Sequence, residues 1–302
     1  MERRLSYKKY RNLPLHLMIL PGLLLVLIYC YGPMFGLVIS FQKFIPARGI
    51  GGSEWIGWEN FRYVFELPGF TKVLWNTIFI SFMKLFANLL VPIVMALLLN
   101  EVRKEAFKRG VQTLIYLPHF LSWIILGGVL IDILSPSQGI VNEILAWVGI
   151  KPIYFLGSNA WFRYVLVGSD VWKEFGFNTI VYLAALTGIN PSLYEASIVD
   201  GANRWKQTMH VTLPGIVPII VLLSVLSLGN VLNAGFDQVF NLYSAQVYET
   251  GDILDTFVYR IGLLEAQYGV ATAIGFFQSV VTLAFISLSY YLAYRFANYR
   301  IF

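Results

Sequence analysis

The segment NPSLYEASIVDGANRWKQTMHVTLP, residues 190–214, separates two long apolar stretches of a 302-residue chain. Asn190 followed by Pro191 is typical of a helix start, because Asn caps free backbone amides and Pro fits the first helical position. Gly201 can adopt the left-handed conformation that ends a helix, and Asn203 can cap a second helix. The segment therefore predicts two short helices with a bend at Gly201. Their apolar side chains would be exposed unless another protein covers them: Leu193, Tyr194, Ile198 and Val199.

Apolar residues dominate the rest of the chain as well. They make up 57% of the sequence, and charged residues make up only 13%, against about 25% in soluble domains. A bilayer-spanning helix needs about 20 apolar residues, and helix is the conformation that satisfies the backbone in lipid. This composition excludes a cytosolic enzyme, a disordered chain and a secreted disulfide scaffold. The sequence predicts an all-α integral membrane protein with six transmembrane helices, over residues 15–41, 73–99, 112–134, 162–186, 213–232 and 270–296.

Lysine and arginine are distributed unequally over the segments between these runs. Thirteen lie before the first run, after the second or fourth run, or at or after the end of the sixth, whereas seven lie in the alternate segments or at their edges and two lie deep inside runs. Because cytoplasmic loops are enriched in Lys and Arg, we expect both termini and residues 190–214 in the cytoplasm. The net charge of +5 therefore indicates orientation, and we expect no nucleic-acid partner. Cys30 is the only cysteine, which excludes an intramolecular disulfide and a cysteine metal cluster.

Several catalytic motifs are absent from the sequence. It contains no GxxxxGK[ST] phosphate loop, no G-x-S-x-G elbow and no H-E-x-x-H pair. The three histidines are far apart and lack metal-ligand spacing: His16, His119 and His210. We therefore expect no catalytic residues, no metal site and no bound cofactor on this chain.

Three short motifs follow one another in residues 190–214: Glu195-Ala196-Ser197, Asp200-Gly201-Ala202 and, nine residues later, Val211-Thr212-Leu213-Pro214. The segment resembles the EAA loop of ABC importer permeases, with Ser197 in place of the second alanine of the triplet and Thr208 where an aromatic residue is common. This resemblance implies that the loop inserts into a groove on a separate ATPase subunit. The residues it assigns to ATPase coupling are Glu195, Ala196, Ser197, Asp200, Gly201, Ala202, Trp205, Leu213 and Pro214.

Further motifs extend the resemblance over most of the chain. They include Trp75-Asn76-Thr77, Asp170-x-Trp172-Lys173-x-x-Gly176, Gly235-Phe236-Asp237-Gln238 and Tyr268-Gly269-x-Ala271-Thr272-Ala273-x-Gly275. Together they resemble carbohydrate-uptake permeases, particularly the branch of the lipoprotein-associated and uronide-oligosaccharide systems. The resemblance implies the type I importer fold, with a permease domain at 72–296. Residues 1–71 would hold the basic N-terminus, the first transmembrane helix and the first external loop, and 297–302 a cytoplasmic tail.

The resemblance also implies the partners of this chain. They are a second homologous permease subunit in a heterodimer, two ATPase subunits that bind ATP and Mg²⁺, and an extracellular or periplasmic solute-binding protein. The chain would lie in a bacterial cytoplasmic membrane, surrounded by lipid, and import oligosaccharides by alternating access. A different class of function is an ATP-independent secondary carrier or channel for a polar solute. The exposed apolar side chains of the loop argue against this alternative.

Four charged residues lie deep inside the predicted spans, away from their ends, where charge is costly and most often functional. Asp170, Lys173 and Glu174 are neighbours on one helix face, so Asp170 and Lys173 can neutralise each other and hold the helix packing. Direct contact with a sugar is the alternative for all of these side chains: Lys84, Asp170, Lys173 and Glu174.

Uncharged polar residues and one further acid near the ends of spans are candidates for a substrate path. Amide, carboxylate and phenol groups can hydrogen-bond to sugar hydroxyls, but such side chains also join helices to one another in membranes. Both interpretations apply to Asn178, Tyr182, Asn230, Asn233, Asp237, Gln238 and Gln278.

Overall fold

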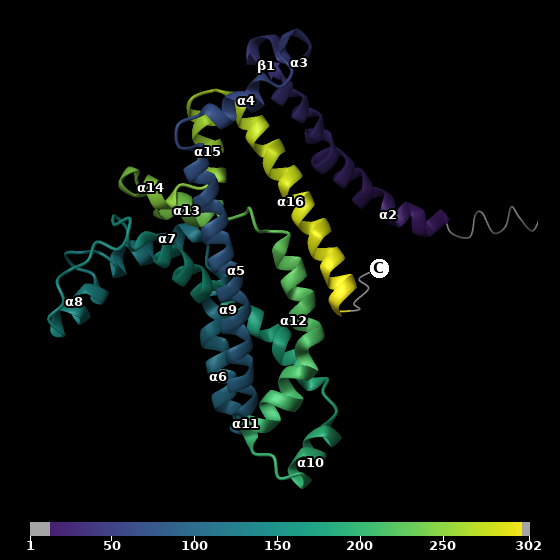
Figure 1. Cartoon of the computed structure of the whole chain (residues 1–302), viewed down its shortest axis with the longest axis vertical. Helices are drawn as coiled ribbons and strands as arrows, with labels where there is room; N and C mark the ends of the chain where they lie inside the picture. Colours follow the sequence, from purple (N-terminus) through teal and green to yellow (C-terminus); the bar gives the residue numbers. More distant parts are fainter. Residues whose placement is uncertain (1–12, 298–302) are drawn as a thin grey trace, which may run out of the picture. The chain divides into compact units, whose positions relative to one another are not determined.

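The computed structural model describes residues 13–297, and it is almost entirely helical. The chain forms two compact units, one made of residues 1–66 and 261–276 and the other of 67–260 and 277–302 (Figure 1). The basic residues before position 12 and nearly all of the expected tail at 297–302 lie outside the described residues.

The first unit begins with a long, exposed, apolar helical stretch. This stretch is α2 (Leu13–Val26), the π turn η1 (Leu27–Tyr31) and the 3-10 helix η2 (Gly32–Phe41). Strands β1 (Gln42–Lys43) and β2 (Glu54–Trp55) pair antiparallel, with Gln42 opposite Trp55. The side-chain amide of Asn60 donates to the carbonyls of Ser40 and Gln42, which attaches α4 (Glu59–Glu66), where Asn60 lies, to the junction of η2 and β1. The remaining elements are η3 (Pro46–Arg48), α3 (Gly49–Gly52) and, at the boundary of the units, η7 (Arg260–Leu264).

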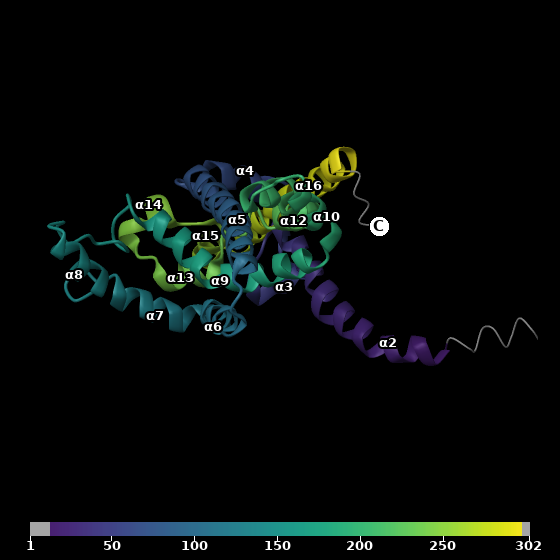
Figure 2. The same ribbon diagram turned by 90° about the horizontal axis from the view of Figure 1, so that it is seen from below.

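The second unit is built on two long helices, α5 (Phe70–Glu101) and α9 (Phe162–Thr187), which pack along each other. Figure 2 shows α7 and α8 leading away from this pair. The other elements are α6 (Glu105–Tyr116), η4 (Leu117–Phe120), α7 (Trp123–Ile133), α8 (Ile140–Trp147), α10 (Pro191–Val199), α11 (Arg204–Gln207), η5 (Thr208–Thr212), α12 (Leu213–Leu228), α13 (Phe236–Leu242), η6 (Ala245–Val247), α14 (Tyr248–Gly251) and α15 (Leu254–Tyr259). Helix α16 (Tyr268–Ala297) begins in the first unit and continues in the second.

Two apolar clusters hold the second unit together. One joins α5 and α9 to α13 and the segment after it, around the buried side chains of Ile80, Phe162 and Val239. The other joins α5, α9 and α12 around Ala96, Tyr182 and Ile216. Since both clusters include α5 and α9, these two helices form the frame on which the other elements are positioned.

Four of the six predicted spans correspond to helices that are long and apolar enough to cross a membrane. They are Leu13–Phe41, Phe70–Glu101, Arg204–Leu228 and Tyr268–Tyr291. Helix α9 covers the predicted run 162–186 but does not meet this standard of length and composition, because three charged residues fall in every 18-residue stretch of it: Asp170, Lys173 and Glu174.

The predicted transmembrane helix over 112–134 is not one continuous helix. The chain there forms two helical pieces, Glu105–Phe120 and Trp123–Ile133, which are bent by 106°. Pro118 lies in the turn η4 and has no backbone N–H to continue the helix. Ser122 then caps the new helix by accepting a hydrogen bond from the amide of Ile125 at 3.4 Å. Proline and serine together therefore divide this apolar run into two helices.

Gly176 of α9 allows α6 to approach closely. A Cβ at this position would lie 2.0 Å from the carbonyl oxygen of Ile115. We expect Gly176→Ala to separate the two helices and to lower the free energy of unfolding by about 1–3 kcal/mol. Thermal unfolding of the purified transporter measures this loss. Gly168→Ala in the same helix is the matched control, because a Cβ there meets no atom within 4 Å. Equal melting temperatures for the two variants would contradict the prediction.

Candidate coupling loop and buried polar network

The segment between α9 and α12 has the two short helices that the sequence predicts. Asn190 precedes α10, and its side-chain oxygen accepts from the amide of Ser192 at 3.0 Å. Asn203 precedes α11 and accepts in the same way from Lys206 at 2.9 Å. Gly201 lies between them with a φ of +73°, the left-handed conformation expected at the bend. Both caps and the bend are therefore confirmed.

The second short helix does not stop before the apolar run. From Arg204 the chain stays helical through the π turn η5 and into α12, which gives one helical stretch of 25 residues to Leu228. The hydroxyls of Tyr194 and Thr212 lie 3.0 Å apart and join α10 to this stretch. The guanidinium of Arg204 also forms an ion pair with Glu101 at the end of α5. The loop is therefore attached both to α12 and to the end of α5.

The loop lies at the lower end of the second unit in Figure 1. Several of its large apolar side chains are exposed. The exposed fraction is 87% for Val199 and 68% for Trp205. Such a group of exposed apolar side chains on a helical tip is typical of a surface that binds another protein. We call it the coupling surface and define it by Leu193, Ile198, Val199 and Trp205.

We expect Asn203→Ala to loosen α11, because it removes the side-chain acceptor that caps the start of this helix. Loss of an Asn cap costs about 1 kcal/mol, which makes local opening about fivefold more frequent. Hydrogen exchange of the Lys206 amide measures this change. Asn203→Asp is the control, since a carboxylate oxygen can accept the same hydrogen bond. Equal exchange in both variants would rule out capping as the function of Asn203.

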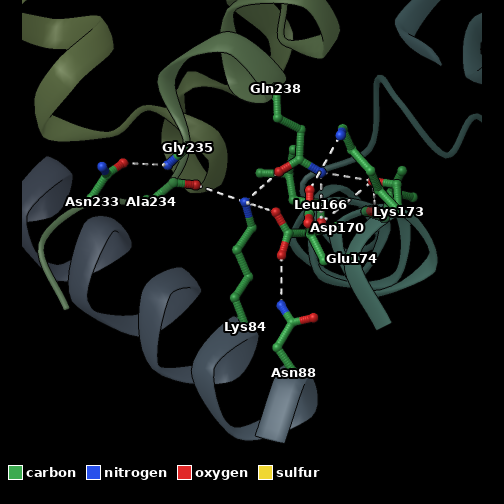
Figure 3. A network of polar contacts seen from close by, with 12 residues as sticks. Lys84, Asn88, Leu166, Asp170, Lys173, Glu174, Asn233, Ala234, Gly235 and Gln238 are labelled. Carbon is green, nitrogen blue, oxygen red and sulfur yellow. Dashed lines mark hydrogen bonds and ion pairs between the residues drawn. The ribbon is translucent and has the colours of Figure 1, made fainter. Parts of the chain in front are cut away.

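The charged residues inside the second unit form a network between α5, α9 and α13 (Figure 3). The ammonium of Lys84 lies 3.2 Å from the Asp170 carboxylate and 2.7 Å from the carbonyl oxygen of Ala234, and it also donates to the side-chain oxygen of Gln238. The other carboxylate oxygen of Asp170 accepts from Asn88 at 2.7 Å. Lys84 is only 7% exposed, so its charge is balanced within the protein.

The predicted ion pair between Asp170 and Lys173 is wrong. Asp170 points to Lys84 on α5, whereas Lys173 lies 3.2 Å from Glu174 and donates to the carbonyl oxygen of His119 at 2.7 Å. The ring of His119 is in turn 2.8 Å from Glu174 through Nδ1. Asp170 and Lys173 of α9 therefore face different neighbouring elements: Asp170 faces α5, and Lys173 faces the turn η4. The partner of Asp170 on α5 is Lys84, and that of Lys173 on η4 is the carbonyl oxygen of His119.

The sequence also gave a signal for Asn88, which was not among the predicted site residues. Asn88 follows Lys84 by four positions, so both lie on one face of α5. A polar side chain one turn from a buried lysine indicates that this face meets another polar group. His119 had no comparable signal, because its partner Glu174 is 55 residues away.

The residues expected to line a path have different environments. Tyr182 is 1% exposed inside an apolar cluster and Gln238 is 0% exposed, so in this conformation neither lies on an open path surface. Asn230, Asn233 and Asp237 are exposed and close together in sequence between α12 and the start of α13. For these two residues the structure favours the second of the two interpretations, in which polar side chains join helices: Tyr182 packs between α5, α9 and α12, and Gln238 of α13 donates to α9.

Two further path candidates lie on other helices. Asn178 of α9 is partly exposed. Gln278 of α16 is also partly exposed and donates to the carbonyl oxygen of Leu232 at 3.0 Å and to Asp255 at 3.3 Å. Burial raises the pKa of Asp255 on α15, and the hydrogen bond from Gln278 acts in the opposite direction. Gln278 therefore connects α16 to the chain on both sides of α13.

Comparisons with known proteins identify the family of this chain. Residues 88–301 match the family described as "Binding-protein-dependent transport system inner membrane component". The chain is 43% identical over 296 residues to the polygalacturonan/rhamnogalacturonan transport system permease protein YteP of Bacillus subtilis strain 168, covering 98% of this chain and 92% of the relative. It is 39% identical over 282 residues to protein LplB of the same organism, covering 93% and 89%.

Solved structures give the same result for the fold. A chain in the crystal structure of a bacterial ABC transporter involved in the import of the acidic polysaccharide alginate matches with a TM-score of 0.90 and 41% identity, over 97% of this chain and 99% of the other. A second match is to the bacterial alginate ABC transporter in complex with an alginate pentasaccharide-bound periplasmic protein. Its TM-score is 0.89 and its identity 40%, over 97% and 98% of the two chains.

Proposed function

Since this chain belongs to the family of inner membrane components of binding-protein-dependent transport systems and is the permease subunit of a sugar importer of the ABC class, we propose that it carries acidic oligosaccharides. The observation that carries the proposal is similarity over nearly the whole length of two transporters of acidic polymers. One is named for polygalacturonan and the other imports alginate. Oligosaccharides that contain uronic acids are therefore the proposed class of cargo.

In this proposal the chain crosses the cytoplasmic membrane six times, with residues 72–296 as the permease domain and both termini in the cytoplasm. Helix α9 then supplies the one span that does not meet the standard of length and composition, and the bent pair Glu105–Phe120 and Trp123–Ile133 supplies another. The charges of α9 support its place among the spans, because its acids pair with Lys84 of α5 and with Lys173 in the interior of the second unit.

The proposed role of the coupling surface is to dock on an ATPase subunit. Exposed Val199 and Trp205 support this role, since binding would remove their apolar area from water. ATP and Mg²⁺ would bind to that partner, and this chain would bind no cofactor. Closure of the ATPase pair on ATP would then move the loop, and the continuous helix from Arg204 to Leu228 would carry the motion to the path.

The proposed path is lined by the exposed and partly exposed polar groups at the ends of α12 and on α9 and α16. Amide groups suit this task because they both donate to and accept from sugar hydroxyls. The residues we retain for this role are Asn178, Asn230, Asn233, Asp237 and Gln278.

The proposal is tested with the complete transporter in liposomes, together with its second permease, ATPase and solute-binding protein. We expect galacturonate and alginate tetrasaccharides to stimulate ATP hydrolysis and to be taken up, and maltotetraose of equal length to have no effect. Stimulation by maltotetraose alone would refute the acidic class. Uptake by the permease subunits in an ion gradient without the ATPase would instead favour a secondary carrier.

A further inference from the structure

The connection between α12 and α13, residues 229–235, is not helical and lies beside the middle of α5. Its neighbour there is Lys84, the fifteenth of the 32 residues of α5. Non-helical backbone at membrane depth is tolerated only where protein or trapped water satisfies its polar groups. The connection therefore needs hydrogen-bond partners from the surrounding helices.

Lys84 supplies the partner for the last carbonyl before Gly235. A lysine ammonium has three donors, and in this structure they face three acceptors: Ala234 O at 2.7 Å, Asp170 Oδ1 at 3.2 Å and the side-chain oxygen of Gln238. With all three donors used within the chain, the ammonium has none left for a carboxylate on the cargo (Figure 3). Its contacts instead fix the backbone of the connection.

The contacts of Gln238 extend this arrangement to α9. Its side-chain amide donates to the carbonyl oxygen of Leu166 at 2.7 Å and to the hydroxyl of Ser169 at 2.8 Å. Asp170 is also held by Asn88 of α5. The start of α13 and the end of the connection are therefore attached to both helices of the frame.

This attachment determines where two exposed polar side chains lie. The side-chain oxygen of Asn233 accepts from the backbone N–H of Gly235 at 3.2 Å, so its direction depends on the backbone at Gly235. Gly235 has a φ of +91°, and a Cβ there would lie 3.1 Å from the Lys84 ammonium. Asp237 follows in the first turn of α13, next to the buried Gln238. Both exposed groups are thus placed by buried ones.

We propose that Lys84 is a positioning residue for substrate passage, which holds residues 229–235 in the form that presents Asn233 and Asp237 to the cargo. The inference rests on the proposed place of these two side chains on the path. Lys84 acts through the carbonyl oxygen of Ala234 and the side chain of Gln238. Removal of Lys84 is therefore expected to raise the concentration of cargo that half-saturates ATP hydrolysis. The maximal rate of ATP hydrolysis is expected to stay unchanged.

The first test measures the position of the connection without any cargo. Ala234 is 1% exposed, so a cysteine there, in a Cys30→Ser background, is expected to react slowly with a water-soluble maleimide in the complete transporter. Neutralising the ion pair with Lys84→Met and Asp170→Asn removes the donor to Ala234. We expect labelling at least about tenfold faster, as loss of a charged hydrogen bond implies.

The matched control neutralises the second buried pair, with Lys173→Met and Glu174→Gln. It removes an equivalent lysine and acid from α9, neither of which bonds to the connection. We expect labelling of the cysteine at 234 to stay unchanged in this control. The proposal would be overturned if the double variant of Lys84 and Asp170 were labelled at the same rate as the background that carries only the cysteine at 234 and Cys30→Ser. It would also be overturned if the control variant were labelled as fast as the double variant.

The second test is functional and separates this inference from the proposed cargo. ATP hydrolysis is titrated with galacturonate, alginate and maltose tetrasaccharides, so the choice of cargo is decided on the unaltered transporter. With whichever probe is active, we expect the double variant to raise the half-saturating concentration about tenfold and to keep its maximal rate. An unchanged half-saturating concentration would overturn the role of Lys84, whatever the identity of the sugar. Should the double variant fail to assemble, Gly235→Ala provides the same two measurements, because its methyl group displaces the Lys84 ammonium locally.

Discussion

Val199→Asp is expected to abolish sugar-stimulated ATP hydrolysis and uptake while leaving the permease folded. Val199 is 87% exposed on the coupling surface, so the substitution disturbs no interior packing of the chain. On docking, however, the valine would be buried, with a gain of about 1.5–3 kcal/mol that the aspartate loses. A carboxylate buried without a partner adds a further cost of several kcal/mol. Together these costs weaken the complex by more than about a hundredfold.

The measurement combines co-purification of the ATPase with uptake in liposomes. Val199→Ile is the control, because it keeps an apolar side chain of similar shape, and we expect it to retain coupling. Two further variants disturb other features of the same loop. Glu195→Lys reverses a charge, and Gly201→Trp places a bulky residue at a φ of +73°. Retention of full stimulated hydrolysis and uptake in all three disruptive variants would show that the loop is not the coupling element.

The parts of this loop that could be predicted from the sequence depend on local interactions. The caps at Asn190 and Asn203 act on amides two and three residues away, and the bend at Gly201 depends on one backbone angle. Such features need only a few neighbouring residues, so a short stretch of sequence contains the information. The π turn at Thr208–Thr212 had no such local signal, and the continuous helix from Arg204 was therefore missed.

The polar network could not be predicted in the same way, because its partners are far apart in the chain. Local spacing favoured Asp170 with Lys173, but the structure pairs Asp170 with Lys84, which is 86 positions earlier. Which of two neighbouring helices each side chain meets is decided by how α5, α9 and η4 pack. The sequence identified the right charged residues, since charge is costly in an apolar span, and it left their partners open.

The bend of 106° in the third apolar run is an intermediate case. Pro118 was visible in the sequence, and a proline inside an apolar run is compatible with either a kinked span or a complete break. Ser122 decides between them, because its hydroxyl starts a new helix two residues after the turn η4. Composition and length cannot distinguish these two outcomes, so the predicted helix over 112–134 did not include the bend.

Lys84→Met alone is expected to destabilise the permease strongly. The variant leaves the Asp170 carboxylate in the interior with Asn88 as its remaining partner, and loss of one member of a buried ion pair costs about 3–5 kcal/mol. Thermal or denaturant unfolding of the purified transporter measures this effect. Lys72→Met on the same helix is the control, since its ion pair with Glu249 lies in solvent, and we expect almost no change.

Asp170→Asn added to Lys84→Met is expected to restore most of this stability, because no buried charge then lacks a partner and an asparagine oxygen can still accept from Asn88. Replacement of both members of a buried pair is often nearly neutral. The comparison separates two roles of Lys84 that the single variant mixes. Charge balance is recovered in the double variant, whereas the hydrogen bond to Ala234 is not, so stability should return and the position of residues 229–235 should not. A double variant as unstable as the single one would mean that the bond to Ala234, rather than the charge of Asp170, determines the stability of this region.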